Sequence, residues 1–274
     1  MRGIDATIRV FAVPGRPIDN RPQVVNLPHI SAASMRSLRE FTSARVALGR
    51  TGHSLPTQEL LDFQLAHARA RDAVHSRLDV ASLMLEVKKR GLDCIAAKSA
   101  AADRQVYLLR PDLGRRLSAA SAQAIRDSKG EFDVVFVIAD GLSALAVHRY
   151  ALAVLDSGMA RLRDWRIAPI VLVEQGRVAI ADEIANLLGA SIAAILLGER
   201  PGLSAPDSLG IYMTWKPAPG ITTDAERNCI SNIRTGGLSP EVAAGRLVYL
   251  LTEARRRMIS GVKLKGPDRK LFIP

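Results

Sequence analysis

Short apolar runs that end in glycine or a charged residue dominate the middle of the chain. Ile170–Val173 and Ile192–Leu197 are runs of this kind, which are typical of buried parallel strands. Between them, apolar residues recur at helical spacing, and Gly189 is placed to end that helix. The order strand, helix, strand predicts a parallel sheet. The polar residues after each strand then lie at one edge of that sheet, where open α/β folds bind ligands.

The same pattern predicts more strands in an α/β region that begins near Cys94. They are Val106–Leu109, Val134–Ile138 and Ile211–Trp215. Asp140 follows the second of these, so it is expected at the same sheet edge as Glu174 and Glu199. Ser143 can cap the helix that comes next.

Periodic apolar residues predict helices on both sides of this region. At the N-terminal side, Ser31–Leu48 is expected to be the first helix. Thr57 can cap a second helix, and Asp79 can cap a third that ends at Gly91. These segments predict a helical region before the sheet.

Two helices are predicted towards the C-terminus. Thr223 or Asp224 can cap one that runs through Ile233. The other has Pro240 at its first position and an apolar stripe that extends to Met258.

These elements place the chain in the α/β class. Residues 1–30 hold four prolines and are expected to form an extended N-terminal arm. Residues 31–92 are expected to form a helical N-terminal subdomain. Residues 93–274 are expected to form a Rossmann-like, doubly wound domain with a mostly parallel sheet, which ends in a basic tail.

The composition fits one substantial core without a membrane segment. Of the 274 residues, 48% are apolar but only 4% are aromatic, so the core must be aliphatic. No apolar run approaches the roughly 20 residues of a membrane helix. Asp5 and Arg9 interrupt the N-terminus, which does not resemble a signal peptide. Two cysteines, Cys94 and Cys229, are too few for a disulfide framework, so the cytoplasm is the expected compartment.

The net charge of +11 raises the question of a polyanionic partner such as nucleic acid. The basic clusters Lys88–Arg90, Arg115–Arg116 and Arg255–Arg257 are scattered, and no aromatic residues are interleaved with them for base stacking. A basic subunit that docks on an acidic one explains the same charge. A nucleic-acid-binding module is therefore kept only as an alternative.

No motif of a self-contained enzyme is present. The chain has no GxGxxG after its first α/β strand, and no GxxxxGK[ST], GxSxG or HExxH. Its five histidines do not fall at metal-ligand spacing, so no catalytic or metal-binding residue is assigned. The sequence favours a subunit that supplies binding surface. A stand-alone α/β enzyme that acts on a small molecule is the other alternative.

Three residues could contact a ligand at the sheet edge. Glu199 follows a strand and can accept hydrogen bonds from a polar ligand, or it can simply pair with Arg200 in an exposed loop. Val178 follows Gly176 at a helix start, where the chain can approach a ligand closely, but it can equally be a core valine. Cys229 is predicted on a short helix with no His or Lys nearby, which favours a packed thiol over a nucleophile.

Five motifs lie along the chain in the order Thr42–Gly52, Leu109–Leu117, Glu174–Val178, Gly198–Gly202 and Arg227–Ile233. Together they resemble the small (light) subunit of ethanolamine ammonia-lyase over roughly residues 35–262. The resemblance implies a heavy-subunit partner, a TIM barrel that binds ethanolamine, with adenosylcobalamin at the barrel mouth under this chain. It implies conversion of ethanolamine to acetaldehyde and ammonia by radical chemistry. Carried over by motif, the cobalamin-binding residues are Val178, Glu199 and Cys229.

Two further expectations follow from this resemblance. Residues 1–30 lack the amphipathic leader helix that some relatives carry for entry into a bacterial microcompartment. Both the cytoplasm and a microcompartment therefore stay open as locations. The D-x-H-x-x-G sequence, through which one class of cobalamin proteins supplies a histidine to cobalt, is absent. The cofactor is expected to keep its own dimethylbenzimidazole as the lower ligand.

Overall fold

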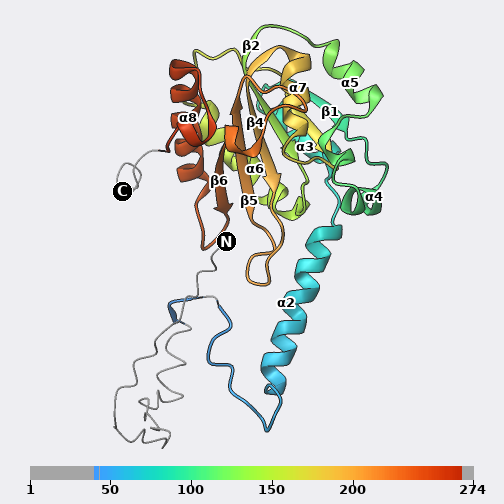
Figure 1. The fold of residues 1–274 in the computed structure, drawn as a ribbon, viewed down its shortest axis with the longest axis vertical. Coiled ribbons are helices and arrows are strands. Elements are labelled where there is room, and N and C mark those ends of the chain that lie inside the picture. Colours follow the sequence, from blue (N-terminus) through green and yellow to red (C-terminus); the bar gives the residue numbers. More distant parts are fainter. Residues whose placement is uncertain (1–39, 43, 267–274) are drawn as a thin grey trace, which may run out of the picture. The chain divides into compact units, whose positions relative to one another are not determined.

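The structure, a computed structural model, describes residues 40–42 and 44–266 (Figure 1). The chain divides into two compact units, Met1–Gly49 and Arg50–Pro274, and the second holds the sheet. The predicted arm of residues 1–30 and most of the predicted helix Ser31–Leu48 lie outside the described residues. Residues 44–48 are described and are not helical, so that helix prediction is wrong at its C-terminal end. The domain boundaries expected after residues 30 and 92 stay a prediction.

A sheet of six strands forms the centre of the part of the chain that the structure describes (Figure 1). In spatial order the strands are β1 (Cys94–Lys98), β3 (Ile170–Glu174), β2 (Phe132–Ala139), β4 (Ala190–Gly198), β5 (Leu209–Trp215) and β6 (Arg227–Ile233). The first four are parallel to one another, whereas β5 and β6 are antiparallel to their neighbours. The predicted α/β class with a mostly parallel sheet is therefore confirmed.

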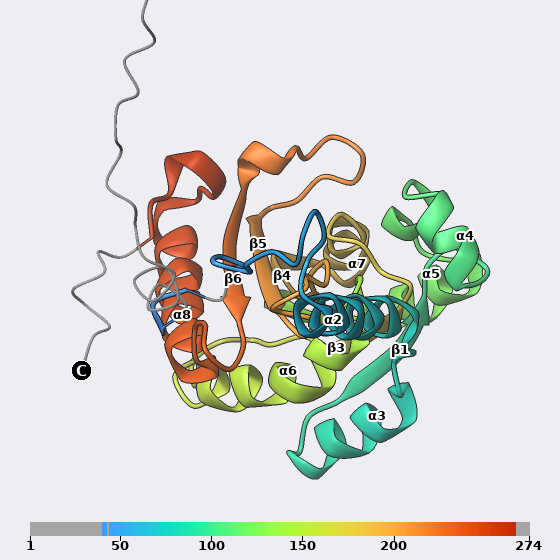
Figure 2. The ribbon, with the colours of Figure 1, turned by 90° about the horizontal axis from the view of Figure 1, so that it is seen from below.

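Helices pack against both faces of this sheet (Figure 2). One face carries α3 (Val80–Lys89), α6 (Ala144–Met159) and α8 (Pro240–Arg257). The other face carries α5 (Ala119–Arg126) and α7 (Ile180–Leu188). Aliphatic side chains fill both layers, as the low aromatic content requires. Because helices lie on both sides, β2 and β4 are buried along almost their whole length.

The helix α2 (Thr57–His75) is the least buried of the described helices. Ala73 is its one buried residue, and it extends away from the sheet (Figure 1). Its mean hydropathy is low, because charged and amide side chains alternate with the apolar ones. Within residues 40–42 and 44–266, no helix combines the length and the apolar character needed to cross a bilayer.

Side-chain caps explain where several helices begin. Asp79 and Ser143 each accept a hydrogen bond from a backbone N–H in the first turn of the helix that follows, as predicted. Thr57 is the first residue of α2 instead of its cap, and Pro56 precedes it without a side-chain hydrogen bond. The prediction of a cap at Thr57 is therefore wrong by one position.

The ends of α7 and α8 follow the expected backbone chemistry. Gly189 ends α7 in the left-handed conformation at φ 79°, and Pro240 is the first residue of α8, both as predicted. Met258 does not continue the apolar stripe of α8. It ends the helix at φ 55° and is 66% exposed. Of the predicted basic tail, residues 261–266 are described, and Leu264 is buried against the core.

The strand predicted at Val106–Leu109 is a helix, α4 (Arg104–Leu109). Asp103 accepts a hydrogen bond from the Val106 N–H at 2.8 Å and so caps the first turn. A buried strand would hide alternate side chains or all of them, yet Leu109 is 71% exposed and only Tyr107 is buried. The first strand of the sheet is β1, at the place where the α/β region was expected to begin.

The strand β6 replaces the helix predicted to run from Thr223 through Ile233. Thr223 and Glu226 do form a capping box, but it begins only a single 3-10 turn. The residues that follow pair with β5 along their length. Without them, β5 would be an open sheet edge, so strand pairing outweighs the local cap. Cys229 therefore lies on a strand and not on a helix.

Candidate functional site

A groove opens over the part of the sheet that helices cover on one face only. α8 packs against β5 and β6 from one side, whereas α7 on the other side packs on β2 and β4. β5 supplies part of the floor of the groove, α7 forms one wall, and the loop between β5 and β6 forms the other (Figure 2). The groove has a volume of about 1410 Å³. One end of the groove reaches the carboxyl end of β4, the edge predicted to bind a ligand.

The lining of the groove balances its charges. The arginines are Arg115, Arg116, Arg177, Arg200 and Arg227. The carboxylates are Asp112, Asp182, Glu183, Glu199 and Asp224. Apolar surface comes from Val178, Leu187, Leu197 and the ring of Tyr212. Such a lining suits a large ligand with an extended apolar body and polar groups at its rim.

The predicted contact residue Glu199 lies in the groove at the carboxyl end of β4. Its Oε2 accepts a hydrogen bond from the Ser208 hydroxyl at 2.5 Å and another from the Asn232 N–H at 3.3 Å. The alternative of a simple pair with Arg200 is not what the structure shows, because no salt bridge joins these two described residues. Glu199 is thus held by its neighbours and presented at the rim.

A close backbone crossing positions this end of the groove. The loop after β2 contains Gly141, which has φ 54° and packs on the end of β4. A Cβ on Gly141 would lie 2.2 Å from the Gly198 carbonyl oxygen, and a Cβ on Gly198 would lie 2.1 Å from the Ser143 carbonyl oxygen. Only glycine fits at both positions. The crossing fixes the chain directly before Glu199.

Val178 lies on the wall of the groove, two residues before α7 begins. It is half-buried and packs partly against the core below α7, and its role as a ligand contact stays a prediction. The preceding Arg177 donates its backbone N–H to the Gly114 carbonyl at 2.8 Å. That contact joins the loop at Leu113–Arg115 to the start of α7. The two motifs Leu109–Leu117 and Glu174–Val178 therefore build one corner of the groove.

Cys229 lies on β6 directly opposite Tyr212 of β5, and Tyr212 lines the groove. The Cys229 side chain is exposed, so it is a surface thiol on the open side of the sheet. Desolvation by its neighbours raises the pKa of this thiol, and the Tyr212 hydroxyl beside it lowers the pKa in part. A raised pKa disfavours the thiolate, which supports packing over nucleophilic chemistry.

A buried ion pair joins the wall of the groove to β6. Arg227 donates to both oxygens of Asp182, at 2.7 Å and 2.6 Å, and the two side chains are 5% and 2% exposed. Burial alone would lower the pKa of the Arg227 guanidinium, but the hydrogen bonds to Asp182 outweigh it and the pKa is raised. The bidentate geometry fixes α7 relative to the strand that carries Cys229.

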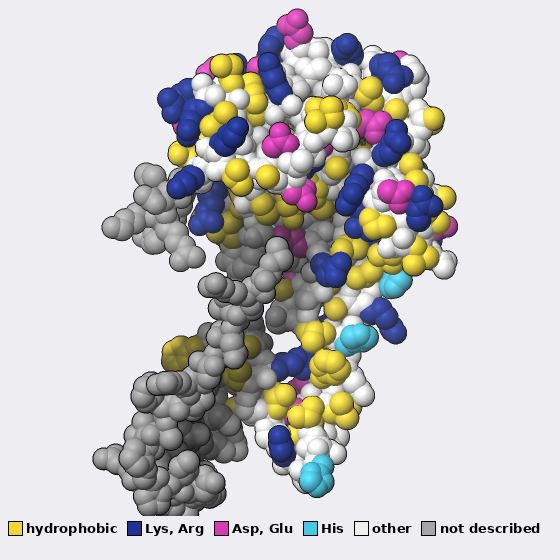
Figure 3. Space-filling model, in the orientation of Figure 1, with side chains coloured by type: hydrophobic (Ala, Val, Ile, Leu, Met, Phe, Trp, Pro, Cys, Tyr) yellow, Lys and Arg dark blue, Asp and Glu magenta, His cyan; other side chains and the backbone are white. Residues whose placement is uncertain are grey.

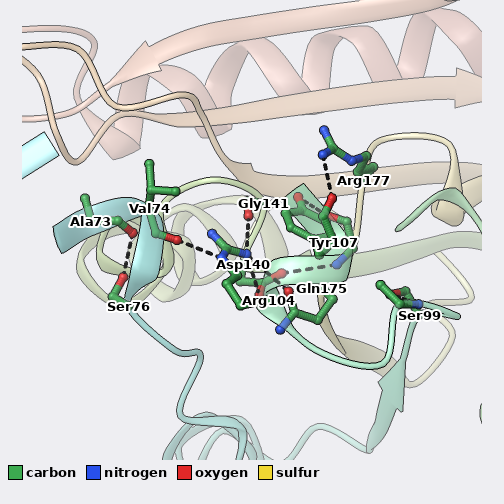
Figure 4. Close-up of polar contacts among 12 residues, drawn as sticks. Ala73, Val74, Ser76, Ser99, Arg104, Tyr107, Asp140, Gly141, Gln175 and Arg177 are labelled. Carbon is green, nitrogen blue, oxygen red and sulfur yellow. Dashed lines mark hydrogen bonds and ion pairs between the residues drawn. The ribbon is translucent and has the colours of Figure 1, made fainter. Parts of the chain in front are cut away.

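A second cluster lies where β2 and β3 end, around Arg104 (Figure 4). Arg104 Nε donates to the Val74 carbonyl at 2.7 Å, near the end of α2. Its Nη1 donates to the Gly141 carbonyl at 2.9 Å and lies 3.3 Å from Asp140 Oδ2. Asp140 Oδ1 accepts the Gly176 N–H at 3.1 Å. Arg104 thereby ties α2 to two of the strand-end loops.

Tyr107 completes this cluster and connects it to the groove (Figure 4). Its hydroxyl donates to the Gly176 carbonyl at 3.0 Å. The guanidinium carbons of Arg104 and Arg177 lie 4.7 Å and 4.5 Å from the centre of its ring, within cation–π range. Burial, together with the charge of Asp140, raises the pKa of the Tyr107 hydroxyl, which stays neutral.

Burial also governs Asp140, which is 2% exposed. It raises the pKa of the Asp140 carboxyl to about 6, although the Arg104 charge and the backbone N–H groups act in the opposite direction. The sequence correctly placed Asp140 at the strand edge, but the side chain faces inwards and supports the loops. The carboxylates at this edge thus divide into a supporting one, Asp140, and a groove-facing one, Glu199.

Several residues that build the groove gave no signal in the sequence. Ser208, Asp182 and Tyr212 belong to no motif of catalysis or binding, and each becomes relevant only through a contact with another element of the fold. Arg227 lies at the start of a recognised motif. Its partner Asp182 lies in α7, whose amphipathic pattern does not indicate that this aspartate is buried. Glu174, at the predicted edge, pairs with Lys98 at 3.1 Å and does not line the groove.

The basic surplus of the chain does not gather at the groove. On the face shown in Figure 3, Lys and Arg side chains are interspersed with acidic and apolar ones over the sheet domain. The groove itself has equal numbers of arginines and carboxylates. No single positive stripe marks a path for a nucleic-acid backbone on this face.

The comparison with known proteins assigns the family. The family description "Ethanolamine ammonia-lyase light chain (EutC)" matches residues 32–265. The chain belongs to this family. Among curated proteins, it is similar to the ethanolamine ammonia-lyase small subunit of Pseudomonas aeruginosa, with 55% identity over 251 residues that cover 88% of this chain and 92% of the relative. The small subunit of Pseudomonas fluorescens is 58% identical over 238 residues, covering 83% and 85%.

The motifs that resemble the ethanolamine ammonia-lyase light-chain family can be located on the groove. Four of the motifs that carry the resemblance supply lining residues: Leu109–Leu117, Glu174–Val178, Gly198–Gly202 and Arg227–Ile233. These segments are spread over more than a hundred residues of sequence, and the fold brings them to one site. The groove is therefore the place where the family motifs converge.

Proposed function

We propose that this chain is the small subunit of an adenosylcobalamin-dependent ethanolamine ammonia-lyase and that it binds the cofactor against a heavy subunit. The observation that carries the proposal is the convergence of four family motifs on one large groove. The small-subunit names of the relatives imply a heavy-subunit partner. The groove is open along one side, so a partner surface would be needed to close it over a ligand.

The residues present fit cobalamin in size and chemistry. A drug-sized ligand needs a pocket of about 300–1,000 Å³. The groove, at about 1410 Å³, suits a larger molecule with an apolar body and a rim of amide groups. Glu199 can accept hydrogen bonds from such amides, and Val178 and Tyr212 supply apolar contact. We assign Val178, Glu199 and Cys229 as the cofactor-binding residues.

The role proposed for this subunit is to bind, orient and shield. The chemistry that adenosylcobalamin supplies when bound is radical generation from its cobalt–carbon bond. Glu199 would fix one edge of the cofactor through Oε1, which accepts no hydrogen bond from the described residues. Val178 and the Cys229 thiol would exclude water from apolar parts of the cofactor surface. Ethanolamine is expected to bind mainly to the heavy subunit, so no catalytic residue is assigned here.

The composition of the groove also bears on the cobalt. None of the described residues that line the groove is a histidine. His148, on α6, accepts a hydrogen bond from the Asp79 N–H at 3.1 Å and so has a structural role. We therefore propose that the cofactor keeps dimethylbenzimidazole as its lower ligand.

Both the cytoplasm and a microcompartment remain proposed locations.

The test separates the two subunits. The purified chain with adenosylcobalamin and ethanolamine should form no acetaldehyde, whereas adding the heavy subunit should give turnover. Cobalamin affinity of the complex is then measured for Glu199→Ala, which should weaken binding by about 1–3 kcal/mol because ligand donors lose their acceptor. Glu241→Ala, an exposed carboxylate on α8, is the matched control and should bind normally. Turnover by this chain alone would contradict the division of roles.

The two alternatives are tested by the same preparation. A stand-alone enzyme would act without the heavy subunit. A nucleic-acid-binding module would retain RNA or DNA through purification at low salt and lose it steeply as salt rises. The balanced charge of the groove argues against the second of these.

A further inference from the structure

The carboxylate of Glu199 is more constrained than a side chain at a loop start would be. β4 and β5 pair in antiparallel register, with Gly198 opposite Leu209. The residue after Gly198, Glu199, therefore lies opposite the residue before Leu209, Ser208. The Glu199 N–H donates to the Ser208 carbonyl at 2.9 Å. The Ser208 hydroxyl, on a residue 7% exposed, donates to Glu199 Oε2 at 2.5 Å. Backbone and side chain of Ser208 therefore both hold Glu199.

A second donor converges on the same oxygen. The Asn232 N–H lies 3.3 Å from Glu199 Oε2. Asn232 has φ 61°, a left-handed conformation that costs free energy for a residue with a side chain. This conformation near the end of β6 is held in place by the Leu238 N–H, which donates to the Asn232 carbonyl at 2.8 Å. Oε2 thus has two protein donors, one directly before β5 and the other on β6.

The other oxygen is left for a ligand. Within the described residues Oε1 accepts no hydrogen bond, although Glu199 lines the groove. Space for this oxygen comes from Gly210 on β5. A Cβ at Gly210 would lie 2.8 Å from Oε1, and 3.1 Å and 3.2 Å from the Glu199 Cγ and Cδ. Any larger residue at position 210 would push the carboxylate out of this orientation.

We propose that Ser208 and Gly210 are positioning residues that aim Glu199 Oε1 into the groove, where it accepts a hydrogen bond from an amide N–H donor on the rim of the cofactor. The inference rests on the proposed cofactor function. It adds that the specificity of this contact lies in a three-residue unit, with Ser208 occupying one oxygen and Gly210 making room for the other. Carboxylates with one oxygen pre-occupied present a single, directed acceptor, which favours a donor at one place on the ligand.

A double-mutant cycle tests the unit on the complex of both subunits. The equilibrium dissociation constant for cyanocobalamin is measured by visible absorption, so the readout does not depend on turnover. Ser208→Ala should weaken binding about five- to tenfold, the expected effect of losing a hydrogen bond to a charged group. In a Glu199→Ala background, Ser208→Ala should have no further effect, because it acts only through Glu199. Ser204→Ala, an exposed serine of the same loop, is the control and should bind as the wild type does.

Gly210→Ala provides an independent test of the positioning role if the Ser208→Ala chain does not assemble with the heavy subunit. It should weaken cyanocobalamin binding by at least tenfold in the wild-type background, and the loss should disappear in Glu199→Ala, where the added methyl group has room. Gly202→Ala is its control, since a Cβ there meets nothing closer than 3.9 Å.

Equal losses in both backgrounds, or no loss from either variant, would overturn the positioning role while leaving the cofactor contact intact. A Glu199→Ala complex that binds cyanocobalamin as tightly as wild type would instead overturn the cofactor contact itself, and this inference with it.

Discussion

Two buried arginine–aspartate pairs support the groove, and they are built differently. Arg227 donates two short hydrogen bonds to Asp182, and its weaker contacts to Thr214 and Asp224 are 3.2 Å and 3.5 Å long. Arg104 contacts Asp140 at 3.3 Å, and it also donates to the Val74 and Gly141 carbonyls and, at 3.4 Å, to the Gln175 side chain. The first pair fastens one helix to one strand. The second joins α2 and the loops after β2 and β3.

The two pairs differ in how the cost of burying the aspartate carboxylate is offset. Asp182 has both oxygens bound by a single guanidinium, so one partner satisfies the whole carboxylate. Asp140 interacts with backbone N–H groups and with one guanidinium at 3.3 Å, and burial nevertheless raises its pKa to about 6. A rigid pair is suited to fix the wall of a binding groove. A shared, weakly held pair is suited to hold several loops that must meet at one point.

Breaking the bidentate pair should have the largest effect on stability. Arg227→Met leaves the Asp182 carboxylate buried without its partner, and we expect a loss of about 3–5 kcal/mol in the free energy of unfolding. Urea unfolding of the isolated chain measures it. Arg149→Met removes an arginine that is 53% exposed and pairs with Asp207, so it serves as the control with a small loss. Equal losses for the two variants would contradict the argument from burial.

The shared pair should give a smaller loss at neutral pH. Asp140→Asn keeps an acceptor for the Gly176 N–H but turns an amide donor towards Arg104, and we expect a loss of about 2 kcal/mol. Arg104 keeps its two carbonyl partners in this variant, which limits the damage. The measurement is urea unfolding at pH 7.5, side by side with Arg227→Met. A loss larger than that of Arg227→Met would invert the ranking of the two pairs.

The pH dependence of this variant has a definite sign. The folded-state pKa of Asp140, about 6, lies above the unfolded value near 3.9. The carboxyl therefore contributes stability that is fully present below about pH 4 and is lost as the pH rises through 6. Asn has no such titration. The stability gap between wild type and Asp140→Asn should widen as the pH falls from 7.5 to 5, and a gap that narrows would contradict the raised pKa.

The sequence predicted most of what depends on local pattern. The strands β2 to β5, the caps at Asp79 and Ser143, and the edge on which Glu199 lies follow from apolar runs and from the chemistry of short polar residues. Val178 and Glu199 were placed at the groove by motif and by strand ends. These patterns lie within short stretches of sequence, so they can be recognised without knowledge of the fold.

The rest depends on contacts between different elements of the fold. The capping box at Thr223 is present, yet the residues that follow pair with the edge of β5 as β6. Local sequence patterns do not predict this pairing. Ser208 matters only because antiparallel pairing puts it opposite Glu199. Asp182 looks like any polar residue of an amphipathic helix until Arg227 reaches it across 45 residues. Tertiary contacts of this kind leave no period and no motif.

Replacing both members of the bidentate pair should cost less than breaking it. Asp182→Leu combined with Arg227→Met removes two buried charges together, and such replacements are often neutral, so we expect a change within about 1 kcal/mol of wild type. Recovery of stability relative to Arg227→Met alone would show that the single variant suffers from the orphaned carboxylate. A double variant as unstable as the single one would mean that Arg227 contributes chiefly by packing or through Thr214, to which it also donates at 3.2 Å.

The smallest effect is expected at Cys229, which the sequence placed on a helix and the structure places on β6. The thiol is exposed on β6 beside Tyr212, and desolvation raises its pKa, so at neutral pH it is a weakly polar packing group. Cys229→Ala should weaken cobalamin binding by about threefold or less, the loss of one small apolar contact, and should leave turnover at saturating cofactor near the wild-type value. Cys229→Ser, which keeps the size but adds a stronger hydrogen-bonding group, separates packing from polarity. Complete loss of turnover in Cys229→Ala at saturating cofactor would show that the thiol takes part in the chemistry, contrary to the geometry on β6.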